Sequence, residues 1–195
     1  MNKETHTTKL IGLRQVTVIG ILSAICVVLG FSGFGFIPLP TAKATIMHIP
    51  VIIGAILEGP VVGATIGLFF GLFSIFENIT RQTVLSFAFL NPLVSVVPRI
   101  LIGITAYYTY KYAFRKNEAL KTGTAAVIGT LTNTFGVLTM IYVLYAAGFA
   151  QARNIDESAA AAVIYGIALT NGIPESIVAV IVTIPVIAAV KKFRK

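Results

Sequence analysis

Long stretches without a charged residue are the feature that most restricts how this chain can fold. No charge occurs between Arg14 and Lys43, and similar uncharged apolar runs follow along the rest of the sequence. About 20 apolar residues in a helix are enough to cross the hydrocarbon core of a bilayer. Of the 195 residues 11% are charged, against roughly a quarter in a soluble domain. The sequence therefore predicts an all-α integral membrane protein with no room for a soluble catalytic domain.

The apolar runs divide into six segments, which predict a single transmembrane domain covering residues 1–195. The expected six-transmembrane-helix bundle has spans at about 11–29, 45–57, 60–76, 91–110, 122–147 and 164–190. The second segment is short for a complete span, and segments of its length are often re-entrant. Four spans plus a membrane hairpin therefore remain an alternative. We expect the first segment to be retained, since it is longer than the apolar region of a signal peptide.

The basic residues indicate the orientation of the bundle. Eleven of the 15 Lys and Arg residues fall into three clusters that flank apolar runs, namely Lys3, Lys9 and Arg14; Lys111, Arg115, Lys116 and Lys121; and Lys191, Lys192, Arg194 and Lys195. Cytoplasmic loops carry such an excess of positive charge. We therefore expect both termini in the cytoplasm and the loops 31–43, 77–90 and 148–162 outside. This distribution also argues against a nucleic-acid partner despite the net charge of +8.

Small residues recur at helical spacing on two of the predicted spans. Gly59, Gly63, Gly67 and Gly71 are four residues apart in the third, and Gly20 and Ala24 have the same spacing in the first. Such strips let another helix backbone approach closely. For the third span we expect packing within the chain. For the first, internal packing and docking of a separate membrane subunit are both open.

Arg99 is the residue that points most directly to a function. It lies inside an otherwise uncharged span, where a charge costs about 2.5–3.5 kcal/mol or more, so such residues are functional candidates. Asn91 and Ser95 precede it at intervals of four residues, which on a continuous helix places all three on one face.

The two spans that follow also carry polar residues at a comparable depth. Asn133 lies in the fifth span, and Asn171 and Glu175 lie in the sixth. Arg99 is 12 residues from Lys111, Asn133 is 12 from Lys121, and Glu175 is 16 from Lys191. At 1.5 Å per residue these positions are roughly 18–24 Å from the inner boundary. Three helices are thus expected to present polar groups at one level in the outer half of the membrane.

Two interpretations of these groups stay open. Arg99 and Glu175 either neutralise each other as a structural pair, or Arg99 holds an anionic group of a small solute in a polar cavity, since a planar guanidinium matches a carboxylate. Catalysis is disfavoured because the sequence has no P-loop, no H-E-x-x-H and no Gly-x-Ser-x-Gly. A single cysteine, Cys26, and two histidines also give no metal site and no cofactor site. Binding is therefore favoured over chemistry.

A resemblance sharpens this expectation. The stretch Ile46–Pro60, followed by Gly63, Gly67, Gly71, Leu72 and Ser74, resembles the substrate-binding S-components of energy-coupling factor transporters, which import vitamins into bacteria and some archaea. The resemblance is strongest to the pantothenate-type members. It implies six helices in the cell membrane and a vitamin site near the outer face, closed by the loop after the first helix and the loop between the third and fourth.

The same resemblance implies partners. Family members dock through an Ala-x-x-x-Ala motif on the first helix onto a transmembrane coupling subunit, which two cytoplasmic ATPases drive. Gly20 and Ala24 match this motif with one small-for-small change, whereas Val28 departs from it.

Several alternatives to this assignment remain at the level of sequence. The vitamin could be riboflavin, folate or pyridoxine instead of pantothenate. The chain could also be an autonomous secondary carrier that uses Arg99 and Glu175 as a relay, an intramembrane enzyme with Glu175 or His48 as a base, or an assembly protein.

Overall fold

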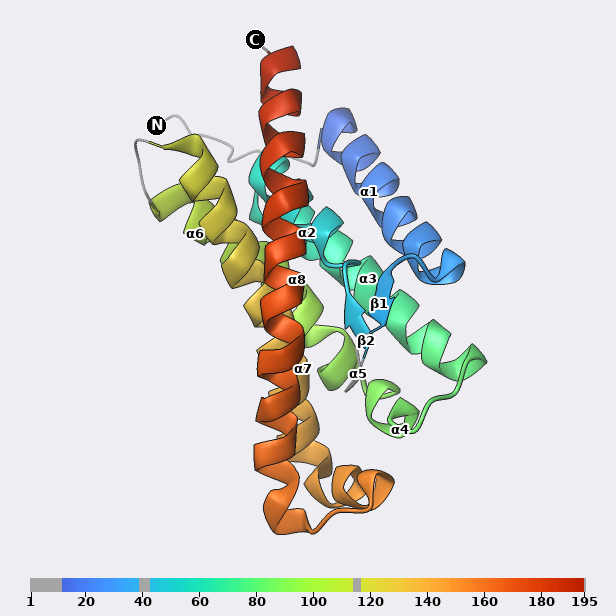
Figure 1. The fold of residues 1–195 in the computed structure, drawn as a ribbon. Coiled ribbons are helices and arrows are strands. Elements are labelled where there is room, and N and C mark those ends of the chain that lie inside the picture. Colours follow the sequence, from blue (N-terminus) through green and yellow to red (C-terminus); the bar gives the residue numbers. More distant parts are fainter. Residues whose placement is uncertain (1–11, 39–42, 114–116, 195) are drawn as a thin grey trace, which may run out of the picture.

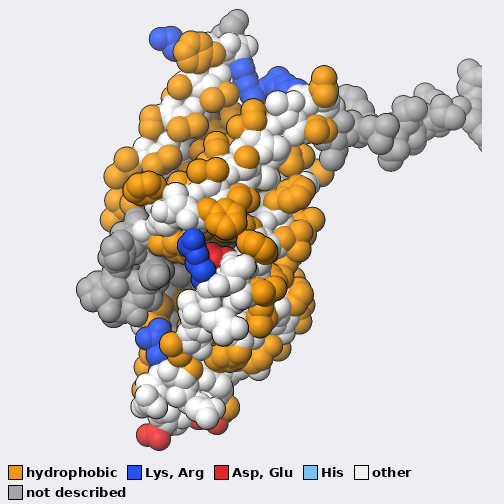
Figure 2. Space-filling view, turned by 90° about the vertical axis from the view of Figure 1, so that its right-hand side faces the viewer, with side chains coloured by type: hydrophobic (Ala, Val, Ile, Leu, Met, Phe, Trp, Pro, Cys, Tyr) orange, Lys and Arg blue, Asp and Glu red, His pale blue; other side chains and the backbone are white. Residues whose placement is uncertain are grey.

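The computed structural model describes residues 12–38, 43–113 and 117–194, and its main elements are helices (Figure 1). Five helical segments are long and apolar enough to cross a membrane. They are α1 (Leu13–Ser32), α3 (Pro60–Thr80), the pair α5 (Pro92–Ser95) and α6 (Val97–Tyr112), α7 (Glu118–Arg153) and α8 (Glu157–Phe193). Hydrophobic side chains cover much of one face of the molecule (Figure 2). The predicted membrane helical bundle is confirmed at this level.

The second predicted span is a short helix with a strand in front of it. Its residues divide between β2 (Lys43–Thr45) and α2 (Ile49–Glu58), and β2 pairs antiparallel with β1 (Phe36–Pro38). Ten residues of helix extend about 15 Å, which is half of the hydrocarbon thickness. Nearly all of α2 is buried, and it contacts α1, α3, α6, α7 and α8. This short apolar helix therefore forms the centre of the bundle.

The fourth predicted span is interrupted. α5 and α6 are separate helices that meet at Val96, and each has a proline in its first turn. Proline has no N–H to donate and favours the start of a helix. Asn91 caps α5 by accepting a hydrogen bond from the Leu93 N–H at 2.9 Å. The short helix α4 (Ser86–Phe89) lies in the loop before it.

The two last helices are longer than the predicted spans. α7 and α8 contain 36 and 37 residues, begin with Glu118 and Glu157, and carry basic residues in their last turns. Charges of these signs stabilise the two ends of a helix, so the helices continue beyond the apolar stretch that was used to predict them. α8 runs as one helix through Pro174 and Pro185. The break in helical backbone angles lies in α7 at Tyr145 (φ −142°, ψ 27°).

Three of the four glycines predicted for this strip lie on α3, and they pack against neighbouring helices of the same chain, as expected. A Cβ at Gly67 would lie 2.1 Å from the Arg99 carbonyl oxygen, and one at Gly71 would lie 2.7 Å from that of Ser95. A Cβ at Gly63 would lie 2.5 Å from the Ala55 Cβ of α2 and 2.9 Å from the Gly103 Cα of α6. Gly59 was wrongly assigned to this strip. It forms the α2–α3 turn with a φ of +105°, and a Cβ there would meet nothing within 4 Å.

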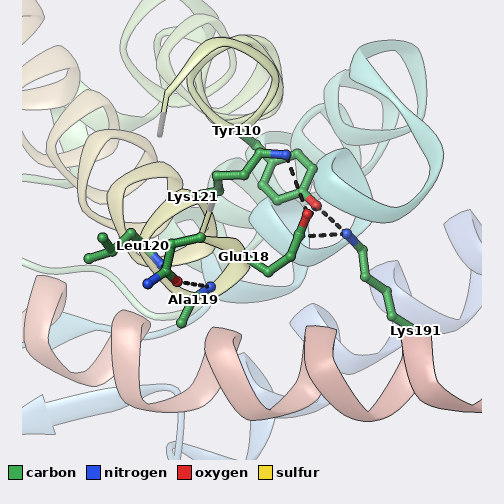
Figure 3. A network of polar contacts seen from close by, with 7 residues as sticks. Tyr110, Glu118, Ala119, Leu120, Lys121 and Lys191 are labelled. Atoms are coloured by element: carbon green, nitrogen blue, oxygen red, sulfur yellow. Dashed lines mark hydrogen bonds and ion pairs between the residues drawn. The ribbon is translucent and has the colours of Figure 1, made fainter. Parts of the chain in front are cut away.

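Ionic contacts join several helix ends at one end of the molecule. Glu58, at the end of α2, pairs with Arg14 at 3.0 Å and with Arg194 at 2.5 Å. Lys191 pairs with Glu118 at 2.9 Å and donates to the Tyr110 hydroxyl (Figure 3). Lys121 of the second cluster pairs with the same Glu118 at 3.4 Å. Members of all three basic clusters therefore lie at this end. Five other members of the clusters lie outside the described residues, namely Lys3, Lys9, Arg115, Lys116 and Lys195.

Candidate functional site

A cavity of about 920 Å³ lies toward the other end of the molecule. The wall is formed by the β1–β2 hairpin, the C-terminal ends of α3 and α7, the loop before α5 and the middle of α8. Four of the six residues that the sequence predicts for a binding site line it, namely Arg99, Asn133, Asn171 and Glu175. The four residues come from α6, α7 and α8, and they share one cavity.

The Arg99 guanidinium is buried, and not all of its N–H groups have an acceptor. Its side chain is 6% exposed, and its Nη1 donates to the Val94 carbonyl oxygen at 2.6 Å. The guanidinium carbon lies 5.5 Å from the centre of the Phe70 ring and 5.7 Å from that of Phe89, distances at which a cation is attracted to an aromatic face. The Nε of Arg99 has no partner among the described residues. The group is therefore oriented, already dehydrated and free to bind an anion.

Glu175 is bound to the hairpin and to α7. Its two carboxylate oxygens accept hydrogen bonds from the Thr45 N–H and the Thr134 hydroxyl, both at 2.6 Å, and the residue is 3% exposed. Among the ion pairs of the described residues, none joins Arg99 to Glu175. Arg99 and Glu175 therefore make no direct ion pair in the described structure, and each has hydrogen-bond partners of its own. Glu175 instead fastens β2 against α7 and α8 at the wall of the cavity.

Asn133 on α7 and Asn171 on α8 each present an unpartnered amide oxygen. Both residues are buried, and neither Oδ1 has a hydrogen-bond partner in the described part of the chain. A buried acceptor without a donor costs about 1–3 kcal/mol. Together with the Nε of Arg99, these atoms provide two acceptors and one donor from three helices for a bound solute.

Asn91 and Ser95 do not line the cavity. The Asn91 amide donates to the Tyr145 hydroxyl at 3.0 Å, and the fully buried Ser95 hydroxyl donates to the Phe89 carbonyl oxygen at 2.5 Å. The expectation of a common face with Arg99 assumed one continuous helix, and the break at Val96 removes that basis. These two residues hold together the corner that leads into α6.

The sequence reasoning missed several residues of the cavity wall. They are Glu77, Asn78 and Arg81 near the end of α3, Arg153 at the end of α7, and the aromatic residues Phe36, Phe70, Phe89 and Phe149. The aromatic residues gave no distinct signal because the chain contains 13 Phe. Arg81 and Arg153 did give a signal in the sequence, since they lie outside the three basic clusters. His48 is fully buried outside the cavity wall, with its Nε2 2.9 Å from the Thr130 hydroxyl.

Known proteins that are similar to this chain indicate its family. Residues 14–187 match the family described as ECF transporter, substrate-specific component. The chain belongs to this family. A relative of this S-component from Lactococcus lactis, named pantothenic acid transporter PanT, is 35% identical over 92% of the chain and 95% of its own length. A second, from Leuconostoc mesenteroides and named pantothenate transporter PanT, is 35% identical over 53% of the chain and 55% of its own length. The resemblance inferred from the sequence is confirmed, and the family consists of transporters, not enzymes.

The small-residue strip of the S-component faces outward. Gly20 and Ala24 are exposed on α1, and a Cβ at Gly20 would meet nothing within 4 Å. Val28, the next position on the strip, is exposed as well. Internal packing therefore does not explain this strip, in contrast to that of α3.

Proposed function

We propose that this S-component binds pantothenate and delivers it to an ATP-driven energy-coupling factor importer in the bacterial cell membrane. The observation that carries the proposal is the buried Arg99 guanidinium with a free Nε on the wall of a cavity that also presents Asn133 and Asn171. The names of the two relatives support the choice of vitamin.

The chemistry of pantothenate matches the wall of the cavity. Its carboxylate suits Arg99, because a guanidinium binds two oxygens in one plane. Its amide N–H and two hydroxyl groups can donate hydrogen bonds to the amide oxygens of Asn133 and Asn171, which have no donor in the described structure. Its two methyl groups require apolar surface, which Val137 and Ile141 supply on the same wall. In this arrangement Glu175 acts through the hairpin, and Asn91 and Ser95 support the helix corner before Arg99.

The proposed orientation places the cavity toward the outside. The end at which the basic clusters meet is cytoplasmic according to the positive-inside rule, so both termini lie inside. β2 and α2 together carry the chain from the cavity to that end, since Thr45 contacts Glu175 whereas Glu58 contacts Arg14 and Arg194. Counted in this way, the short α2 completes a second crossing, and the bundle has six.

The proposed energy source lies in other subunits. The chain has no P-loop, which agrees with two separate cytoplasmic ATPases. The exposed Gly20 and Ala24 on α1 offer a flat strip for a transmembrane coupling subunit. Gly20→Trp should therefore block transport and leave pantothenate binding intact. Loss of binding would show that the strip has a role inside the fold.

Uptake of radiolabelled pantothenate tests the function. Cells that contain the coupling subunit and the ATPases should accumulate the label when this chain is present, and the same cells without the chain serve as the control. Unlabelled pantothenate should compete with the label. Uptake of riboflavin, folate or pyridoxine by these cells, without uptake of pantothenate, would contradict the proposal.

A further inference from the structure

Four Lys and Arg residues lie outside the three basic clusters, and most of them line the cavity. They are Lys43, Arg81, Arg99 and Arg153. The side chain of Lys43 lies outside the described part of the structure, and the other three all line the cavity. Three of the four Lys and Arg residues outside the basic clusters therefore lie at the proposed binding site.

Arg81 and Arg153 occupy the rim of the cavity, whereas Arg99 occupies its interior. Both rim residues are exposed, and Arg99 is buried. Arg81 ends α3, where its N–H donates to the Glu77 carbonyl oxygen at 2.7 Å. The guanidinium carbon of Arg153 lies 5.9 Å from the centre of the Phe149 ring, and Phe149 is a buried residue of the cavity wall. We call Arg81 and Arg153 the outer arginine pair.

The outer arginine pair has no counter-ion of its own in the described residues. None of the ion pairs among them includes Arg81 or Arg153. Glu77 and Glu175 also line the cavity, so its described wall carries three guanidinium groups against two carboxylates. Glu175 has both oxygens engaged with Thr45 and Thr134. By this count the described wall carries a net positive charge, with Arg81 and Arg153 at the rim and Arg99 inside.

We infer that the outer arginine pair captures a small carboxylate solute at the rim before the solute reaches Arg99. This inference rests on the proposed function and adds an association step to it. Charges that line a cleft raise the local concentration of an oppositely charged ligand and accelerate its association. Both side chains of the pair are exposed, and the bound carboxylate contacts Arg99 instead. The pair therefore changes the rate of association and not the lifetime of the complex.

The test compares two double variants with the same change in charge. Arg81→Gln with Arg153→Gln removes the outer pair, and Lys111→Gln with Lys192→Gln removes two exposed cations at the opposite end. Pantothenate binding to the purified, immobilised chain is followed by surface plasmon resonance, with thermal melting as a check on folding. Panthenol, in which an alcohol replaces the carboxylate, is the uncharged control ligand.

In water at low ionic strength, each unit charge attracts a carboxylate about 10 Å away by about 0.4 kcal/mol. Removal of both arginine charges should therefore slow the association of pantothenate roughly fourfold. Dissociation of pantothenate and association of panthenol should not change. In about 1 M salt, where the Debye length is about 3 Å, the difference should disappear.

Equal association rates in the two double variants would overturn the inference, as would equal slowing of panthenol. Faster dissociation from the rim variant would also contradict it, because the pair would then hold the bound solute. A chain that binds no pantothenate before any substitution would refute the proposed function itself and this inference with it.

Discussion

Arg99→Met tests the contribution of the guanidinium to binding. The substitution keeps a long side chain but removes the charge and all five N–H donors. Arg99 makes no direct ion pair among the described residues, and the buried Glu175 keeps its hydrogen bonds to Thr45 and Thr134. The Val94 carbonyl oxygen loses the donor that lies 2.6 Å away. We therefore expect the variant to insert and fold, and to lose affinity for an anion.

The size of this loss follows from the burial of Arg99. The side chain is 6% exposed, so most of its dehydration has taken place before a ligand binds. Removing one partner of a buried hydrogen-bonded charge pair costs about 2–5 kcal/mol. Since 1.4 kcal/mol is a factor of ten, the dissociation constant for pantothenate should rise from about 30-fold to several thousand-fold. Arg99→Lys, which keeps the charge and loses the planar fork, should give an intermediate loss.

Isothermal titration calorimetry of the purified chain measures this effect. Panthenol lacks the carboxylate, so the preference for pantothenate over panthenol should be large in the unsubstituted chain and should vanish in Arg99→Met. Arg14→Met makes the same substitution at the opposite end of the molecule and should leave both affinities unchanged. An unchanged affinity for pantothenate in Arg99→Met would show that Arg99 is structural and would refute the reasoning.

Two further substitutions test the residues that support the site. Gly67→Ala should lower the melting temperature, because the new Cβ would lie 2.1 Å from the Arg99 carbonyl oxygen, and overpacking of this kind costs about 1–3 kcal/mol. Gly20→Ala is the matched control, and an equal melting temperature of the two variants would contradict the close packing at Gly67. Glu175→Leu should speed hydrogen exchange of the Thr45 amide by about tenfold or more, because this N–H loses its acceptor. Glu175→Gln keeps an oxygen for the same bond and should protect the amide, so fast exchange in both variants would show that the hairpin is held elsewhere.

The sequence predicted the bundle because a membrane limits what a long apolar segment can do. Each of the long helices α1, α3, α7 and α8 overlaps a predicted span, although α7 and α8 extend beyond it at both ends. Hydropathy identifies only the apolar part of a helix that lies in the hydrocarbon layer. The length of a helix that continues into water is therefore underestimated. The length of α2 was not predictable in this way, because a buried half-length helix is as apolar as a complete span.

The site could be predicted in part for a related reason. Polar residues inside apolar spans are rare and costly, so Arg99, Asn133, Asn171 and Glu175 stood out in the sequence. Their exact partners depend on local breaks. Pro92 and Pro98 divide the fourth span, and this break separates Asn91 from the face of Arg99. The hydrogen bond from Thr45 to Glu175 joins residues 130 positions apart, and no local pattern reports such a contact.

Native mass spectrometry of the purified chain tests the central claim most directly. The chain is incubated with an equimolar mixture of pantothenate, panthenol, riboflavin, folate and pyridoxine, and the mass of each bound molecule is measured. The account predicts one pantothenate per chain, with panthenol not retained at the same concentration. Retention of panthenol to the same extent as pantothenate, or of a different vitamin in its place, would contradict a site built around the Arg99 guanidinium.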